Sequence, residues 1–78
     1  MSDSGSLPSE LADARSTTRH VYEVLERAGD WMTDTELRER TGYSQPTISR
    51  ACRVIQGEGL ASRRRSLRDS RVIETRLR

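Results

Sequence analysis

The side chains best suited to bind another molecule are arginines, and they are concentrated in the last third of the chain. All 14 basic residues are Arg, and residues 50–78 hold nine of them against three acidic residues, a net charge of +6. Residues 1–14 hold three acidic residues and no Arg, a net charge of −3. A GC-rich genome explains the absence of Lys, but not the concentration of Arg at one end. Because the planar guanidinium fits phosphate and guanine, this gradient predicts a polyanionic partner.

Residues for catalysis or metal binding are scarce. The chain has one His, His20, and one Cys, Cys52. It has neither a Gly-rich phosphate loop nor a nucleophile elbow, and no second His or Cys lies at ligand spacing. The sequence therefore predicts a protein that is not an enzyme and that binds no cofactor and no metal. We expect His20 to be exposed and Cys52 to be a small core residue rather than a redox sensor.

Length and composition limit the class of protein further. The chain has 78 residues, of which 32% are hydrophobic and none is Phe, enough for one small domain without a deep cleft. No run approaches the roughly 18 consecutive apolar residues of a membrane-spanning helix. The N-terminus lacks the features of a secretory signal, and a single cysteine suits a reducing compartment. We therefore expect a cytoplasmic protein, and the predicted polyanionic partner makes it nucleoid-associated.

The first part of the chain predicts an arm followed by a helix. Residues 1–15 are expected to form a flexible acidic arm, and residues 16–78 a single domain. A first helix is predicted from about Thr17 to Ala28, because its apolar residues fall on one face, and Gly29 ends it. Residues 30–32 are too few for a helix and predict a short strand.

Two further helices are predicted in quick succession. Thr33 and Glu36 fit the capping-box pattern, so a short helix should follow and end near Gly42. Ser44 then caps a third helix, in which Pro46 occupies the first turn. The buried stripe expected on this third helix is Ile48, Ala51, Cys52 and Ile55. Its opposite face is polar and basic, with Gln45, Thr47, Ser49, Arg50 and Arg53.

After this helix the pattern changes from helical to alternating. Residues 60–67 and 71–77 predict two strands, joined by a turn over residues 68–70. The resulting order is typical of a helix-turn-helix followed by a hairpin. The fold class predicted is therefore α+β, a winged helix-turn-helix with three helices, a short strand and a C-terminal β-hairpin wing.

Two motifs within this arrangement resemble a known family. Thr47-Ile48-Ser49-Arg50 followed by Gly59-Leu60 resembles the recognition helix of MarR-type transcription regulators. Arg63 and then Asp69-Ser70-Arg71 lie at the spacing of that family's Asp-x-Arg wing. The resemblance covers about residues 18–78. It implies that Asp69 organises the wing together with arginine, and that Arg68 and Arg71 approach the minor groove.

The flanks of the domain depart from that family. MarR-type proteins dimerise through helices on either side of the winged helix, and their ligand pocket lies near that interface. Here an acidic arm precedes the domain and the second wing strand ends at Arg78. The expectation is a winged helix without dimerisation helices and without a small-molecule effector, either an isolated regulator or an excised domain. Because a single small domain binds weakly, a homodimer on DNA or a protein partner is expected.

These observations predict a DNA-binding transcription regulator. The third helix would contact bases in the major groove, and the arginine-rich wing would contact phosphate and the minor groove. Two alternatives remain open: a winged helix that binds another protein, and an excisionase-like architectural protein. The register of the hairpin decides which of its arginines faces DNA. Trp31 and Tyr43 are expected in the core. The candidate DNA-binding residues are Ser44, Gln45, Thr47, Ser49, Arg50, Arg53, Arg63, Arg64, Arg65, Arg68 and Arg71.

Overall fold

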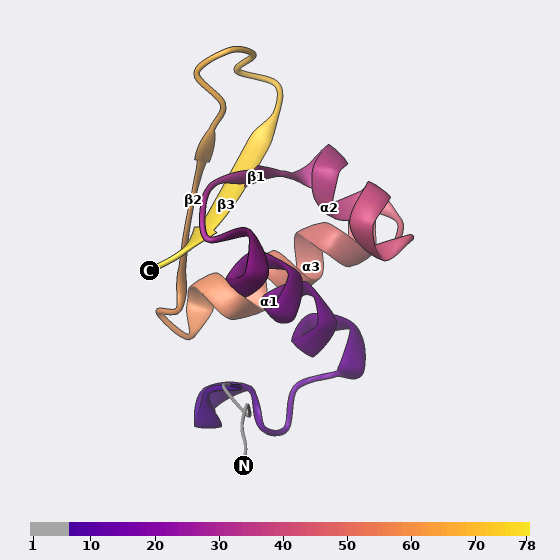
Figure 1. Ribbon diagram of the computed structural model, residues 1–78, viewed down its shortest axis with the longest axis vertical. Coiled ribbons are helices and arrows are strands. Elements are labelled where there is room, and N and C mark those ends of the chain that lie inside the picture. The colour runs from indigo at the N-terminus through magenta and orange to yellow at the C-terminus, as the bar shows by residue number, and fades with distance from the viewer. Residues whose placement is uncertain (1–6) are drawn as a thin grey trace.

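Three helices pack against one face of a small antiparallel sheet, and a hairpin extends from it (Figure 1). The structure, a computed structural model, describes residues 7–78; the first six residues of the predicted arm lie outside this range. The elements, in chain order, are a 3-10 turn η1 (Ser9–Leu11), α1 (Ser16–Ala28), β1 (Met32–Thr33), α2 (Asp34–Thr41), α3 (Gln45–Gly57), β2 (Ala61–Arg65) and β3 (Ile73–Leu77). The predicted α+β winged helix-turn-helix is confirmed.

The ends of α1 and α2 follow from local sequence. Thr33 Oγ1 accepts a hydrogen bond from the backbone N–H of Glu36 at 3.0 Å, and Glu36 Oε1 accepts from the N–H of Thr33 at 2.8 Å. This is the predicted capping box. Gly29 and Gly42 follow the two helices with φ of 65° and 78°, a left-handed conformation that favours glycine.

Helix α3 buries the predicted stripe. Ile48, Cys52 and Ile55 are fully buried and Ala51 nearly so, which places them in the core with Val21 and Leu25 of α1. Ser44 is the N-cap residue, as predicted, but its side chain accepts no hydrogen bond from the backbone. Its hydroxyl instead lies 3.1 Å from the Thr47 hydroxyl, so the two side chains pair with each other.

The sheet has the order β1-β3-β2, with both pairs antiparallel. Thr75, in the middle of β3, lies opposite Met32 of β1 and Arg63 of β2 and is fully buried. The strands are shorter than predicted because the turn begins earlier and ends later. The Ser66 N–H donates to the Val72 carbonyl at 2.7 Å and closes this longer turn. Strands β2 and β3 with their turn, residues 61–77, form the wing.

The segment before α1 packs onto the domain in the part that the structure describes. Leu11 in η1 is fully buried and belongs to the core cluster. A buried leucine holds this segment in place, which differs from the flexible arm expected over residues 1–15. The boundary predicted at residue 15 remains a prediction. No helix among the described residues combines the length and the apolar composition of a membrane span.

Candidate nucleic-acid interface

The polar face of α3 is the first component of the candidate interface. Ser44, Gln45, Arg50 and Arg53 are exposed, whereas Thr47 and Ser49 are half-buried. All six are predicted DNA-binding residues: Ser44 is the N-cap residue of α3, and the other five lie along the helix outside its buried stripe. A helix with such a face fits the width of the DNA major groove.

The wing lies beside this face, and the two enclose an open hollow of about 410 Å³. Gln45, Ser49, Arg53 and Gln56 line it from α3, and three consecutive arginines of β2 line it from the other side. The hollow therefore brings together predicted site residues from two separate segments of the chain, α3 and β2. Its lining residues are Asp34, Gln45, Ser49, Arg53, Gln56, Arg63, Arg64, Arg65 and Ile73.

Arg63 has an ion-pair partner inside the protein. Its Nη2 donates to both carboxylate oxygens of Asp34, at 3.1 and 3.0 Å. The two side chains are only 12% and 9% exposed. The ion pair thus links β2 to the start of α2. The sequence did not indicate this ion pair, because Asp34 lies 29 residues away in sequence.

Arg64 also borders the hollow, but its guanidinium packs on Trp31 and pairs with Glu74. Its guanidinium carbon lies 3.9 Å from the centre of the Trp31 ring, a cation–π contact, and its Nε donates to Glu74 Oε1 at 2.6 Å. The Arg64 side chain is nevertheless 42% exposed. Trp31, expected in the core, is half-buried and outside the core cluster, where it supports this arginine. Tyr43, also half-buried, does pack against the core.

The tip of the wing carries the remaining predicted arginines. Arg65 Nη1 donates to the Ser70 carbonyl at 3.3 Å, and Arg68 is exposed. Asp69 accepts a hydrogen bond from the Arg71 backbone N–H at 3.0 Å and pairs with the Arg71 guanidinium. The backbone bond, with help from the guanidinium, lowers the pKa of Asp69 below its usual value. This is the organising role that the resemblance implied for Asp69.

Arg50 faces a different hollow, of about 290 Å³, between α3 and the segment before α1. Thr47 and Val54 of α3 line it together with Asp13 and Ala14. The exposed arc of α3 therefore extends from the wing on one side to the N-terminal segment on the other. Asp13 of that segment therefore lies near α3 rather than near the wing.

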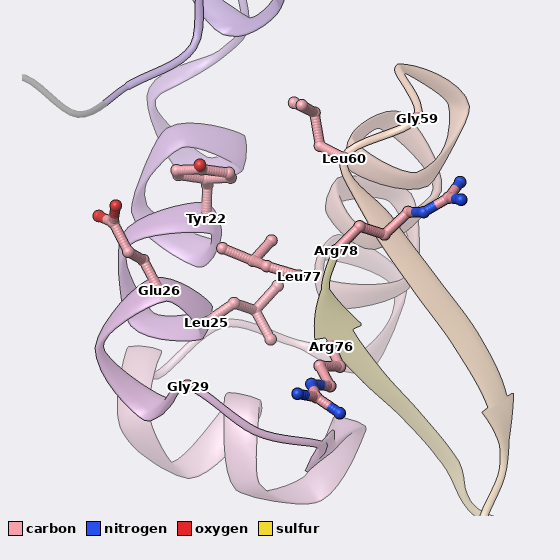
Figure 2. A pocket seen from close by; sticks show the side chains of 9 residues that line it. All are labelled: Tyr22, Leu25, Glu26, Gly29, Gly59, Leu60, Arg76, Leu77 and Arg78. Carbon is pink, nitrogen blue, oxygen red and sulfur yellow. The ribbon is translucent and has the colours of Figure 1, made fainter.

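A separate pocket of about 460 Å³ lies at the end of the hairpin away from its turn. Figure 2 shows Leu77 of β3 pointing toward Tyr22 and Leu25 of α1, with Leu60 on the other side of the opening. None of the predicted DNA-binding residues lines this pocket. It is thus independent of the candidate interface.

Two residues of the interface region were not singled out from sequence. Asp34 was seen only as part of a capping pattern, and its buried ion pair has no local signal. Leu67, at the wing tip, is 88% exposed between the exposed arginines. The prediction placed Leu67 at the end of a strand, and an apolar residue directly before Arg68 is the signal that could have indicated it.

The single Cys and the single His of the chain both contact other parts of the domain. Cys52 is buried, as predicted, and burial raises the pKa of its thiol. His20 is exposed, and its Nδ1 lies 3.0 Å from the Tyr43 hydroxyl. Among residues 7–78, no three His, Cys, Asp or Glu side chains are grouped as metal ligands would be.

Helix α2, a glycine turn, helix α3 and a C-terminal hairpin wing together define the class of winged helix-turn-helix proteins. The sequence matches the model of the MarR family over residues 23–72. Since this is more than half of the chain, the protein belongs to the MarR family. The family is one of regulators, in agreement with the prediction that the chain is not an enzyme.

Solved structures share this fold. A mutant of MepR from S. aureus, bound to an oligodeoxyribonucleotide, superposes with a TM-score of 0.76 and 21% identity over 88% of this chain and 52% of that one. A mutant of ZitR from Lactococcus lactis superposes with a TM-score of 0.69 and 23% identity over 86% of this chain and 46% of that one. The chain thus spans about half the length of these proteins. A search of curated protein sequences found no significant match.

Proposed function

We propose that this chain is a DNA-binding transcription regulator that inserts α3 into the major groove and lays its wing on the phosphate backbone or in the minor groove. The observation that carries the proposal is the hollow between α3 and β2, where polar residues of the helix meet arginines of the wing. A surface with a polar helix beside a cationic hairpin matches the alternation of groove and backbone on a duplex. Membership of the MarR family and the similar fold of DNA-bound MepR support it.

The proposed contacts are assigned by the position of each residue along α3 and the wing. Arg50 and Ser49, at the middle of α3, would contact base edges, while Ser44 and Thr47 lie at its N-terminus, where free backbone N–H groups favour phosphate. Arg53 would contact a phosphate on the side facing the wing. The wing residues assigned to phosphate or the minor groove are Arg64, Arg65, Arg68 and Arg71. Arg63 supports the wing without touching DNA.

One copy of this domain covers few base pairs, so tight binding needs two copies on a repeated or palindromic site, or a protein partner. The proposed role also implies a location with the DNA, in the cytoplasm at the nucleoid.

The first experiment is a titration of the purified chain against random duplex DNA at two salt concentrations, followed by selection from a randomised pool. A steep salt dependence and an enriched motif would support the proposal, because phosphate contacts release counterions and base contacts select sequence. Absence of binding at low salt would overturn it and favour a winged helix that binds a protein.

A single substitution tests base contact. Arg50→Ala should weaken binding to the selected site by about 1–3 kcal/mol, because an arginine fork on guanine supplies about that much discrimination. Binding to random DNA should change far less. Equal losses on the two DNAs, measured by the same titration, would show that Arg50 contacts only the backbone.

A further inference from the structure

We propose that Asp34 is a specificity-determining residue, which fixes the Gln45 side chain so that it presents only its carbonyl oxygen to DNA. Gln45 would then accept a hydrogen bond from the exocyclic amino group of adenine or cytosine. This inference rests on the proposed function, since it names the class of base that the same interface selects. Its evidence is a hydrogen-bond network at the N-terminus of α3.

The network starts at the Asp34 carboxylate, which is nearly buried. Arg63 Nη2 donates to both of its oxygens, and the Oδ2 atom also accepts from Gln45 Nε2 at 2.9 Å. Asp34 is the first residue of α2, Gln45 the first residue of α3, and Arg63 the central residue of β2. One carboxylate thus joins the two helices of the helix-turn-helix to the wing.

The second amide hydrogen of Gln45 is also used. Nε2 donates to Ser49 Oγ at 3.0 Å, one turn further along α3. A glutamine amide has two N–H donors and one carbonyl acceptor. Both donors are therefore bound within the protein, and no hydrogen bond to Gln45 Oε1 occurs among the described residues.

The chemistry of Asp34 determines the orientation of this amide. A carboxylate paired with arginine can only accept hydrogen bonds, so rotating the Gln45 amide by half a turn would bring its oxygen against Asp34. That repulsion excludes the flipped orientation. A glutamine with both orientations open can donate as well as accept and can pair with adenine through N6 and N7. Here only the acceptor is left.

The major groove offers amino donors only on adenine and cytosine, whereas guanine and thymine present acceptors at the equivalent edge. Gln45 is exposed and lines the hollow between α3 and the wing, where a base edge would approach. The selected site should therefore carry adenine or cytosine at the Gln45 position, and exclude guanine and thymine.

The first test needs no DNA. In the free protein, exchange of the Gln45 side-chain amide hydrogens, measured by NMR, should be slower than that of Gln56 by about tenfold, because only the former are held by two acceptors. Gln56 is exposed on the same helix and lines the same hollow, which makes it an internal control. Equal exchange at the two residues would overturn the proposal, whether or not the protein binds DNA.

The second test compares sites selected by three proteins. Asp34→Asn can accept or donate, so both amide orientations open, and guanine and thymine should become as frequent as adenine and cytosine at one position. Glu39→Gln makes the same change of charge at an exposed position of α2 and should leave the selected site unaltered. Unchanged selectivity in Asp34→Asn would overturn the proposal.

Folding is controlled with a double variant. Asp34→Asn leaves Arg63 with a weaker partner, so Asp34→Asn combined with Arg63→Gln removes both charges and avoids an unpaired buried cation. Circular dichroism checks that each variant is folded, and the double variant should show the same relaxed selectivity. Failure of the wild-type chain to bind any DNA would reject the proposed function, while the exchange measurement would still decide the state of Gln45.

Discussion

At the scale of single residues, three consecutive arginines of β2 have three different environments. Arg63 is held by Asp34 inside the domain, Arg64 stacks on Trp31, and Arg65 is exposed near the wing turn. Side chains alternate between the two faces of a strand, so neighbours in sequence are separated in space. We therefore expect the three arginines to contribute differently to stability and to DNA binding.

We expect Arg63→Ala to lower the free energy of unfolding by about 3 kcal/mol, because it leaves the buried Asp34 carboxylate without its cation. Arg65→Ala, two residues along the same strand, should change it by less than about 0.5 kcal/mol. Arg65→Ala should instead weaken binding to every DNA sequence and reduce the salt slope by about 1. Urea unfolding and DNA titration measure the two effects. Similar stability losses in both variants would contradict this division.

At the scale of elements, the turn between α2 and α3 sets how the recognition helix is presented. Gly42 ends α2 in the left-handed conformation, and its N–H donates to the Arg38 carbonyl at 2.8 Å. A side chain would meet no atom there, so only the backbone conformation restricts this position to glycine. The turn into α3 thus includes one residue in a conformation that favours glycine.

Gly42→Ala should therefore destabilise the domain by about 1–2 kcal/mol, the cost of a left-handed alanine. Gly57→Ala is the matched control, since Gly57 lies in the last turn of α3, also with open space around it. It should raise stability by about 0.5–1 kcal/mol through helix propensity. Thermal or urea unfolding distinguishes them. A loss of stability in both variants would indicate that steric contacts of the added methyl group, and not the φ angle of Gly42, cause the destabilisation.

The wing turn is an element with its own pH dependence. Hydrogen bonds from Arg71 lower the pKa of Asp69. The stabilisation they provide is present above the pKa of an unfolded aspartate, about 3.9, and is lost as pH falls through the lower pKa of the folded state. The Arg71 amide NMR signal should therefore shift below about pH 4. Asp69→Asn should abolish that shift, and its persistence in the variant would assign the titration to another group.

At the scale of the whole molecule, charge is divided between the ends of the chain. The N-terminal segment is acidic, the C-terminal third is basic, and the described part of the segment packs beside α3. Asp13 lines the same hollow as Arg50. At 0.1 M salt, charges interact over about 10 Å, so the Asp13 carboxylate repels a phosphate backbone that approaches α3.

Neutralising the three acidic residues of the N-terminal segment should raise the affinity of the chain for random DNA severalfold. The variant Asp3→Asn, Glu10→Gln, Asp13→Asn keeps Leu11, whose removal by deletion would cost about 2–5 kcal/mol as a lost core side chain. A control with Glu23→Gln, Asp30→Asn and Glu39→Gln changes the net charge equally at exposed positions elsewhere. Titration with random duplex compares the two. Equal gains would mean that only net charge matters and that the segment has no special effect.

The sequence by itself determined the order of the elements and the residues on the buried and exposed faces of α3. Capping residues, glycines at helix ends and apolar spacing act within a few residues, so they can be recognised locally. The fold class, the capping box at Thr33 and the stripe from Ile48 to Ile55 were predicted for that reason.

Only the tertiary structure decided which arginines remain available and what holds them. Asp34 and Arg63 are 29 residues apart, and their pairing depends on where β2 lies against α2. Leu11 was assigned to an arm because its burial requires a cavity formed by other elements. Such contacts are set by packing between distant segments, where the lowest free energy belongs to the whole domain and not to any local pattern.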